Sequence, residues 1–305
     1  MSIKKAPAFL QKGDKIAIIS TARSISSAEV APAIALFESW GLEVQKGAHL
    51  HAVDRQFAGT DKERLEDLQK AMNDPEIKAI VCSRGGYGTA RILDRLDLSH
   101  FNRHPKWVVG YSDVTALHLH LHRYTDWCTL HATMPINISP SPTDAQELSI
   151  SSLYNLLFGH DNSYQLVKHP LNRPGDMSGT LLGGNLSMIY SLLGSPSCPD
   201  FGSCVLFLED LDEYLYHVDR MTLNLKRNGV FEKLSGVLIG SMSDMNDNTI
   251  PFGKTAEEIL SEHLSGYDFP VYFGFPAGHQ ELNLAMPFGA KCAVEANKFS
   301  PVLAG

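Results

Sequence analysis

The 305-residue sequence lacks the features that mark several protein classes. Its five cysteines, at positions 82, 128, 198, 204 and 292, form no C-x-x-C motif, and their odd number argues against a disulfide framework. No stretch approaches the length of a membrane span, and the basic N-terminus lacks the apolar segment and cleavage site of a signal peptide. We therefore expect a globular cytoplasmic protein with reduced thiols.

Basic charge is also scarce. Lys and Arg number 26 against 34 Asp and Glu, so the net charge is −8. A nucleic-acid partner would require a basic face, and a neutral or zwitterionic small substrate fits better. Apolar residues make up 44% of the chain, which is enough for a full core.

Metal and nucleotide motifs are missing as well. The chain has no H-E-x-x-H, and no acid or cysteine near His118, His120 and His122 completes a zinc set, so we expect these histidines on the partly exposed side of a helix. The glycine-rich loop at 83–88 matches no dinucleotide or P-loop fingerprint. It suits an oxyanion-hole donor or a carboxylate nest, or else a tight turn without a ligand. No cofactor and no metal are expected.

The hydrophobic pattern predicts an α/β protein. Short apolar strands alternate with amphipathic helices in the first half, which indicates a parallel sheet covered on both faces. The strands are expected at 15–20, 42–44, 77–82 and 107–109, and the helices at 31–40, 61–72, from Thr89 and at 114–122. A Ser-, Pro- and Gly-rich stretch predicts a linker at 161–176 between domains 1–160 and 177–305.

The second domain is predicted to be a mixed α/β unit with more antiparallel strand, with a small barrel as one arrangement. Its strands are expected at 179–182, 203–208, 236–240, 271–273 and 291–295, and its helices at 185–193, 219–228 and 255–264.

The most informative local stretch is Gly110-Tyr111-Ser112-Asp113, which lies between an apolar strand and a helix. This is the layout of a nucleophile elbow, in which a serine hydroxyl stands at the sheet edge and the next amide can stabilise an oxyanion. Val114 occupies the position where the G-x-S-x-G motif has its last glycine. The alternative is that Ser112 or Asp113 only caps the helix.

An acid and a base could complete this site. Glu209 ends a predicted strand, where a carboxylate can orient an imidazole, or where it is simply solvated. His279 follows Gly278 in a loop after another predicted strand, as a general base would, although a surface histidine is an equal alternative. His131 is a second candidate. The chain order of serine, acid and histidine is that of α/β-hydrolases.

Six segments together resemble the LD-carboxypeptidases of serine peptidase family S66, nearly end to end. They are Gly13–Ala17, Ser83–Gly88, Gly110–Asp113, Gly179–Leu186, Leu208–Asp210 with Asp219–Met221, and Gly278-His279. The resemblance implies a flavodoxin-like N-terminal domain carrying the nucleophile and a smaller C-terminal domain with a β-barrel. The chain has His131-Ala132-Thr133 where the family usually shows His-Gly-Pro.

By this resemblance Ser112, Glu209 and His279 are catalytic, the amides of Gly86 and Asp113 form the oxyanion hole, and Arg84, Gly85 and Tyr87 bind substrate. The implied reaction releases terminal D-alanine from murein tetrapeptides in peptidoglycan recycling, and a homodimer is implied.

Three alternatives remain open at this point. The first is a binding protein for a peptide or sugar without chemistry, since a fold does not fix function. The second is the family branch that hydrolyses microcin-type antibiotics, although its aromatic nucleotide-binding loop is not found here. The third is a metallohydrolase that uses the histidine-rich helix.

Overall fold

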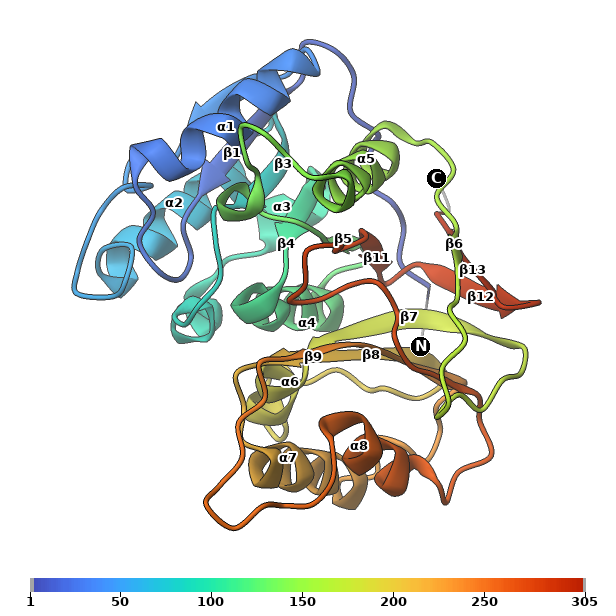
Figure 1. Cartoon of the computed structure of the whole chain (residues 1–305). Helices are drawn as coiled ribbons and strands as arrows, with labels where there is room; N and C mark the ends of the chain where they lie inside the picture. Colours follow the sequence, from blue (N-terminus) through green and yellow to red (C-terminus); the bar gives the residue numbers. More distant parts are fainter. Residues whose placement is uncertain (1–2, 304–305) are drawn as a thin grey trace.

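Two β-sheets with helices between and around them form the protein, in a computed structural model that describes residues 3–303 (Figure 1). The first sheet has the strand order β11-β5-β4-β3-β1-β2, and all neighbours pair in parallel except β11 with β5. Its strands are β1 (Lys15–Ile19), β2 (Glu43–Lys46), β3 (Ile77–Cys82), β4 (Trp107–Gly110), β5 (Thr129–His131) and β11 (Met286–Phe288). The order 2-1-3-4-5 of its parallel strands is that of the flavodoxin-like fold, which confirms the prediction.

Helices cover both faces of this sheet because its strands are apolar on both sides. Ile16 and Ile18 of β1 belong to one buried cluster with Phe37 of helix α1, whereas Ile19 belongs to another with Leu68 of α2. Burying one such side chain contributes about 1.5–3 kcal/mol. The α-helices of this half are α1 (Ser27–Ser39), α2 (Asp61–Asn73), α3 (Ser99–Arg103), α4 (Thr115–Tyr124) and α5 (Asp144–Phe158).

Short 3₁₀ helices stand at several strand ends: η1 (Thr89–Arg91), η2 (Leu93–Arg95), η3 (Ser112–Val114) and η4 (Pro135–Asn137). Two of them replace the α-helix expected from Thr89, so that prediction is wrong. The backbone becomes extended at Leu96, and the Asp97 carboxylate then accepts a hydrogen bond from the Ser99 amide at 2.9 Å. Such a local side-chain turn competes with helix extension.

The second sheet is mixed, as predicted, and has the order β10-β9-β8-β7-β12-β13-β6. Its first four strands are parallel to one another and the other three are antiparallel to their neighbours. They are β6 (Tyr164–Gln165), β7 (Met177–Asn185), β8 (Cys204–Leu211), β9 (Gly236–Ser243), β10 (Val271–Tyr272), β12 (Lys291–Glu295) and β13 (Lys298–Val302). The sheet curls, because the segment after β6 returns to the opposite edge, where Arg173 bridges to Val271.

Strand β6 and the bridging residue Arg173 lie inside the stretch 161–176 that the sequence predicts as a linker. The boundaries 1–160 and 177–305 stay a prediction.

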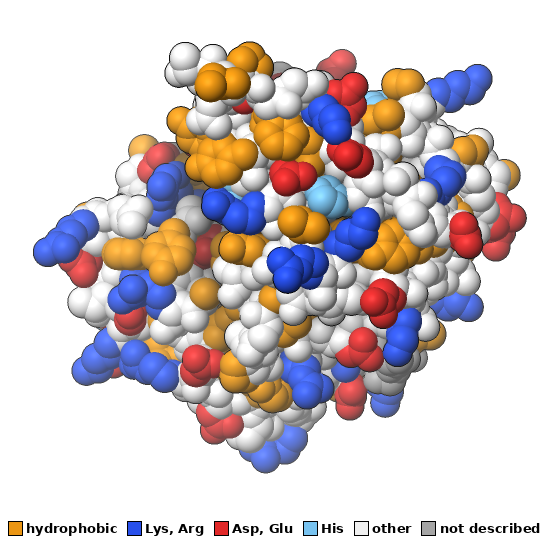
Figure 2. All heavy atoms as spheres, turned by 90° about the horizontal axis from the view of Figure 1, so that it is seen from below, with side chains coloured by type: hydrophobic (Ala, Val, Ile, Leu, Met, Phe, Trp, Pro, Cys, Tyr) orange, Lys and Arg blue, Asp and Glu red, His pale blue; other side chains and the backbone are white. Residues whose placement is uncertain are grey.

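Three helices accompany the second sheet: α6 (Leu186–Leu192), α7 (Leu215–Arg227) and α8 (Ala256–Leu264). Figure 2 shows the face on the side of α7 and α8, where acidic and basic side chains are interspersed and neither sign of charge dominates. Within residues 3–303, no helix has the length and apolar character needed to span a bilayer.

Helix α4 lies between the two halves of the molecule. It packs against β5 on one side and against β7 and α6 on the other (Figure 1). The histidines at 118, 120 and 122 are consequently buried, at 0%, 5% and 6% exposure, so their expected place on a partly exposed face is wrong. His118 instead hydrogen-bonds the Gly110 carbonyl with Nε2 at 2.8 Å, and burial lowers the pKa of this imidazole to about 4.

Candidate active site

Ser112 stands at a strained turn between β4 and α4. Its φ of +63° is left-handed, a conformation that costs a non-glycine residue roughly 1–3 kcal/mol and persists only where the surroundings enforce it. Neither η3 nor α4 has a side-chain cap, so the alternative that Ser112 or Asp113 serves as a helix cap is wrong. The turn therefore has the geometry of a nucleophile elbow.

Three distant segments meet at this turn. The Ser112 hydroxyl lies 3.0 Å from His279 Nε2, and His279 Nδ1 lies 2.7 Å from Glu209 Oε2. Because a carboxylate only accepts, the imidazole carries its proton on Nδ1, and Nε2 is left to accept the serine proton. The structure thus brings together the serine, the histidine and the acid that the sequence placed 167 and 70 residues apart.

Glu209 and His279 are largely shielded from solvent. The Glu209 side chain is fully buried and that of His279 is 14% exposed. Burial acts to lower the pKa of His279, but the charge and hydrogen bond of Glu209, with a contribution from Asp210, outweigh it and raise the pKa above its ordinary 6.5. The pair therefore stabilises an imidazolium next to the serine.

The glycine-rich loop after β3 lies directly against Ser112. A Cβ atom on Gly85 would come within 2.7 Å of Ser112 Cβ, 2.8 Å of its Oγ and 3.5 Å of the Asp113 amide nitrogen. Gly86 has φ +114°, where a side chain is rarely accommodated, and a Cβ there would also meet Arg23 at 2.6 Å. Gly85 therefore allows the backbone to approach the serine more closely than any other residue would.

The Asp113 side chain ties this loop to the turn, a role that the sequence did not suggest. It is 1% exposed, and its Oδ2 accepts a hydrogen bond from the Thr89 amide at 2.8 Å. Burial raises the pKa of this carboxyl. The available signal in the sequence was an acid directly after a candidate nucleophile, at the start of a segment predicted to be helical.

Arg84 and Tyr87 extend from the same loop toward other neighbours. Arg84 donates from Nη1 to the Ser24 carbonyl at 3.2 Å, and Tyr87 is 46% exposed with its ring 6.0 Å from that of Phe57. Both side chains therefore contact residues of other segments, Ser24 and Phe57.

His131 lies behind the site. It is fully buried, and its ring packs 5.6 Å from the ring of Tyr111, which in turn lies 4.9 Å from that of His279. Burial is the largest cause that lowers the pKa of His131 well below its usual range, so the ring is neutral. We conclude that His131 packs beneath Tyr111 and contributes to the core behind the site.

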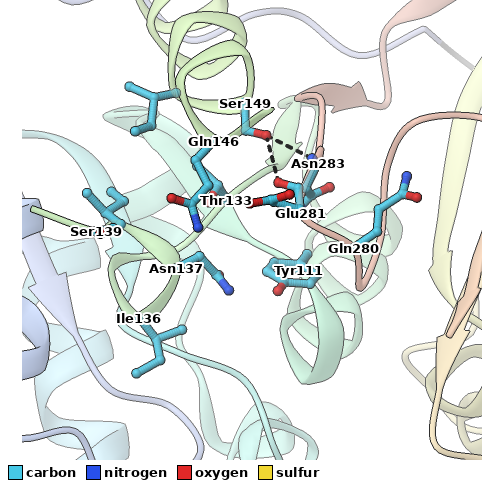
Figure 3. A pocket seen from close by; sticks show the side chains of 12 residues that line it. Tyr111, Thr133, Ile136, Asn137, Ser139, Gln146, Ser149, Gln280, Glu281 and Asn283 are labelled. Atoms are coloured by element: carbon cyan, nitrogen blue, oxygen red, sulfur yellow. Dashed lines mark hydrogen bonds between the residues drawn. The ribbon is translucent and has the colours of Figure 1, made fainter. Parts of the chain in front are cut away.

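A cavity of about 300 Å³ opens next to these residues (Figure 3). Its walls include Tyr111, which precedes the serine, and Gln280, which follows the histidine. The other walls are largely polar, with Asn137, Gln146 and Glu281 among them (Figure 3). Within residues 3–303, no group of three His, Cys, Asp or Glu side chains is placed to hold a metal ion.

Comparisons with known proteins identify relatives of this chain. Family models described as the LD-carboxypeptidase N-terminal and C-terminal domains of peptidase S66 match residues 16–132 and 178–294. The chain is 34% identical to a probable murein peptide carboxypeptidase of Bacillus subtilis, over 100% of this chain and 96% of that protein.

Two solved structures are also similar. The muramoyltetrapeptide carboxypeptidase from Oxalobacter formigenes is 28% identical with a TM-score of 0.82, covering 94% of this chain and 97% of that one. MccF in complex with glutamyl sulfamoyl guanosine shares the fold, with a TM-score of 0.87 at 24% identity over 100% of this chain and 99% of that one. The chain therefore belongs to the LD-carboxypeptidase family, peptidase family S66.

Proposed function

We propose that this protein is a serine carboxypeptidase that hydrolyses the amide bond between an L-configured centre and a terminal D-alanine in murein tetrapeptides. The observation that carries the proposal is the hydrogen-bonded chain from Ser112 through His279 to the buried Glu209. The names of the relatives from Bacillus subtilis and Oxalobacter formigenes support the substrate class.

The reaction follows from these positions. His279 Nε2 takes the proton of Ser112 as Oγ attacks the carbonyl carbon, and Glu209 stabilises the imidazolium that forms. The amides of Gly86 and Asp113 donate to the oxyanion, each worth about 3 kcal/mol in the barrier. His279 then gives its proton to the departing nitrogen of D-alanine, leaving an acyl-enzyme at Ser112.

Water completes the cycle. His279 removes a proton from a water molecule that attacks the acyl-enzyme, and the same proton returns to Ser112 when the ester breaks. Arg84, with Gly85 and Tyr87 on the same loop, is our candidate for binding the substrate, its guanidinium suited to the terminal carboxylate. The proposal includes a homodimer acting in the cytoplasm during peptidoglycan recycling.

The test is Ser112→Ala, assayed by release of D-alanine from a murein tetrapeptide. We expect the variant to lose all measurable turnover, whereas Ser191→Ala, an exposed serine on α6, keeps it. Turnover by Ser112→Ala at the wild-type rate would refute the serine mechanism. Assaying an aminoacyl sulfamoyl nucleotide as a second substrate distinguishes a murein peptidase from an enzyme that hydrolyses microcin-type antibiotics. Binding of intact peptide without product would indicate a binding protein.

A further inference from the structure

The segment that carries His279 crosses from one sheet to the other. It leaves β10 in the second sheet, passes through residues 273–285, and enters β11, which pairs with β5 in the first sheet. Ser112 follows β4, the neighbour of β5, whereas Glu209 lies in β8 of the second sheet. The distance between serine and histidine therefore depends on how this crossing segment is fixed to both halves.

Two contacts fix His279 to the second sheet. Its amide donates to Glu209 Oε2 at 3.2 Å, and its carbonyl accepts from the Ser243 hydroxyl of β9 at 2.5 Å. Both partners belong to the half that carries the acid. These contacts hold the histidine against Glu209. They do not fix its distance from Ser112, which depends on contacts with the other half of the molecule.

A separate set of contacts fixes the segment to helix α5, in the half that carries the nucleophile. The Asn283 amide donates to Ser149 Oγ at 2.8 Å, and the Ala285 amide donates to Ser152 Oγ at 2.9 Å (Figure 3 shows the Ser149 bond). The Ser149 hydroxyl is itself oriented by the Ala145 carbonyl at 2.9 Å. Both serines and Asn283 are buried, so solvent offers these amides no replacement partner.

Asn283 then reaches back toward the histidine. Its Oδ1 accepts a hydrogen bond at 2.9 Å from the amide of Gly278, the residue directly before His279. Gly278 has φ +111°, and a Cβ there would lie 2.8 Å from both Cβ and Oε2 of Glu209. This close approach leaves the backbone next to the histidine little room for adjustment.

We propose that Asn283 is a positioning residue, which together with Ser149 fixes the His279 backbone to helix α5 and thereby sets the position of the imidazole relative to the Ser112 hydroxyl. The proposal rests on the proposed serine mechanism. Asn283 acts through the Gly278 amide and takes no part in proton transfer. Without its Oδ1, that buried amide has lost its partner, and the segment drifts relative to the nucleophile.

The test compares three variants of the full chain: Asn283→Ala, Ser149→Ala and the matched control Ser152→Ala. The two serines lie on the same helix and each accepts one amide of the same segment, so their removal costs similar stability. Of the two serines, Ser149 is the one that hydrogen-bonds Asn283. Since a misplacement of about 1 Å can lower a rate about 100-fold, we expect kcat to fall about 10- to 100-fold in Asn283→Ala and Ser149→Ala, with KM within about twofold. Ser152→Ala should keep kcat within about threefold.

Labelling of Ser112 by a fluorophosphonate gives a second reading that needs no peptide. It should slow in the same two variants and not in the control. Equal kcat values for Ser149→Ala and Ser152→Ala would overturn the proposal, and this comparison decides the matter if Asn283→Ala fails to fold. If wild-type protein is labelled but releases no D-alanine, the murein substrate is wrong and the labelling rates still decide the role of Asn283. If wild-type Ser112 is not labelled at all, both proposals fail.

Discussion

The contact between Gly85 and Ser112 predicts the effect of adding a single methyl group. In Gly85→Ala the new Cβ would lie 2.7 Å from Ser112 Cβ and 2.8 Å from its Oγ, where ordinary contact begins near 3.4 Å. The backbone of Gly85 does not need a positive φ, so the change acts through crowding alone. Either the loop or the serine must move by about 0.7 Å.

The expected cost follows from this displacement. A shift of that size in a reacting atom lowers kcat about 100-fold, which corresponds to about 2.7 kcal/mol in the barrier. The assay is D-alanine release, with fluorophosphonate labelling of Ser112 as a direct measure of the reactivity of this hydroxyl. Thermal unfolding should be measured alongside, because Gly85 is buried and Ser112 half-buried, so the clash is expected to lower stability as well as rate.

The matched control is Gly266→Ala, where nothing lies within 4 Å of the added methyl group. It should behave as wild type in all three measurements. If Gly85→Ala turned over substrate at the wild-type rate, Gly85 would not lie against the working nucleophile, and the assignment of Ser112 would lose its structural basis.

Three further predictions concern the acid, the pH profile and the sheet. Glu209→Gln keeps the shape of the side chain but removes the charge that supports the imidazolium, so kcat should fall about 10³- to 10⁴-fold; a loss under tenfold in steady-state assays would contradict this role. Because the pKa of His279 is raised and only the neutral ring accepts the serine proton, kcat/KM should increase with pH through a midpoint above 6.5, and a midpoint below 6 would count against the ion pair. In Gly183→Ala the new Cβ would meet the Phe207 carbonyl at 1.9 Å at a φ of +145°, so urea unfolding should show a loss of about 3 kcal/mol or more, against about 1 kcal/mol for Gly194→Ala, which has a positive φ but no clash.

Much of the fold could be predicted from the sequence because the long strands and helices have a clear hydrophobic periodicity. The strand at 77–82 and the helix from 61 are examples. The short strands β6 and β11 were missed, since two or three residues contain no period and their pairing partners lie far along the chain. The predicted exposure of the histidines on α4 was wrong for a related reason. The helix packs against strand β7, which begins more than fifty residues later in the chain.

The site divides along similar lines. Ser112, Glu209 and His279 could be singled out because each stands at the end of a predicted strand or directly after a glycine, where functional side chains collect. Asn283 and Ser149 carry no such local signal. Their hydrogen bond joins residues 134 positions apart, and an asparagine in a polar loop looks like an ordinary turn residue until its partner is known.

Strand β11 has a consequence for dissecting the molecule. It comes from the last twenty residues of the chain, yet it supplies the edge strand beside β5 in the sheet that carries Ser112. A fragment ending near residue 160 would present β5 as an unprotected edge, with the apolar surface of α4 uncovered, and both features favour self-association. Attempts to produce the two halves separately should therefore yield aggregates. Reassembly should succeed only when the two halves are refolded together.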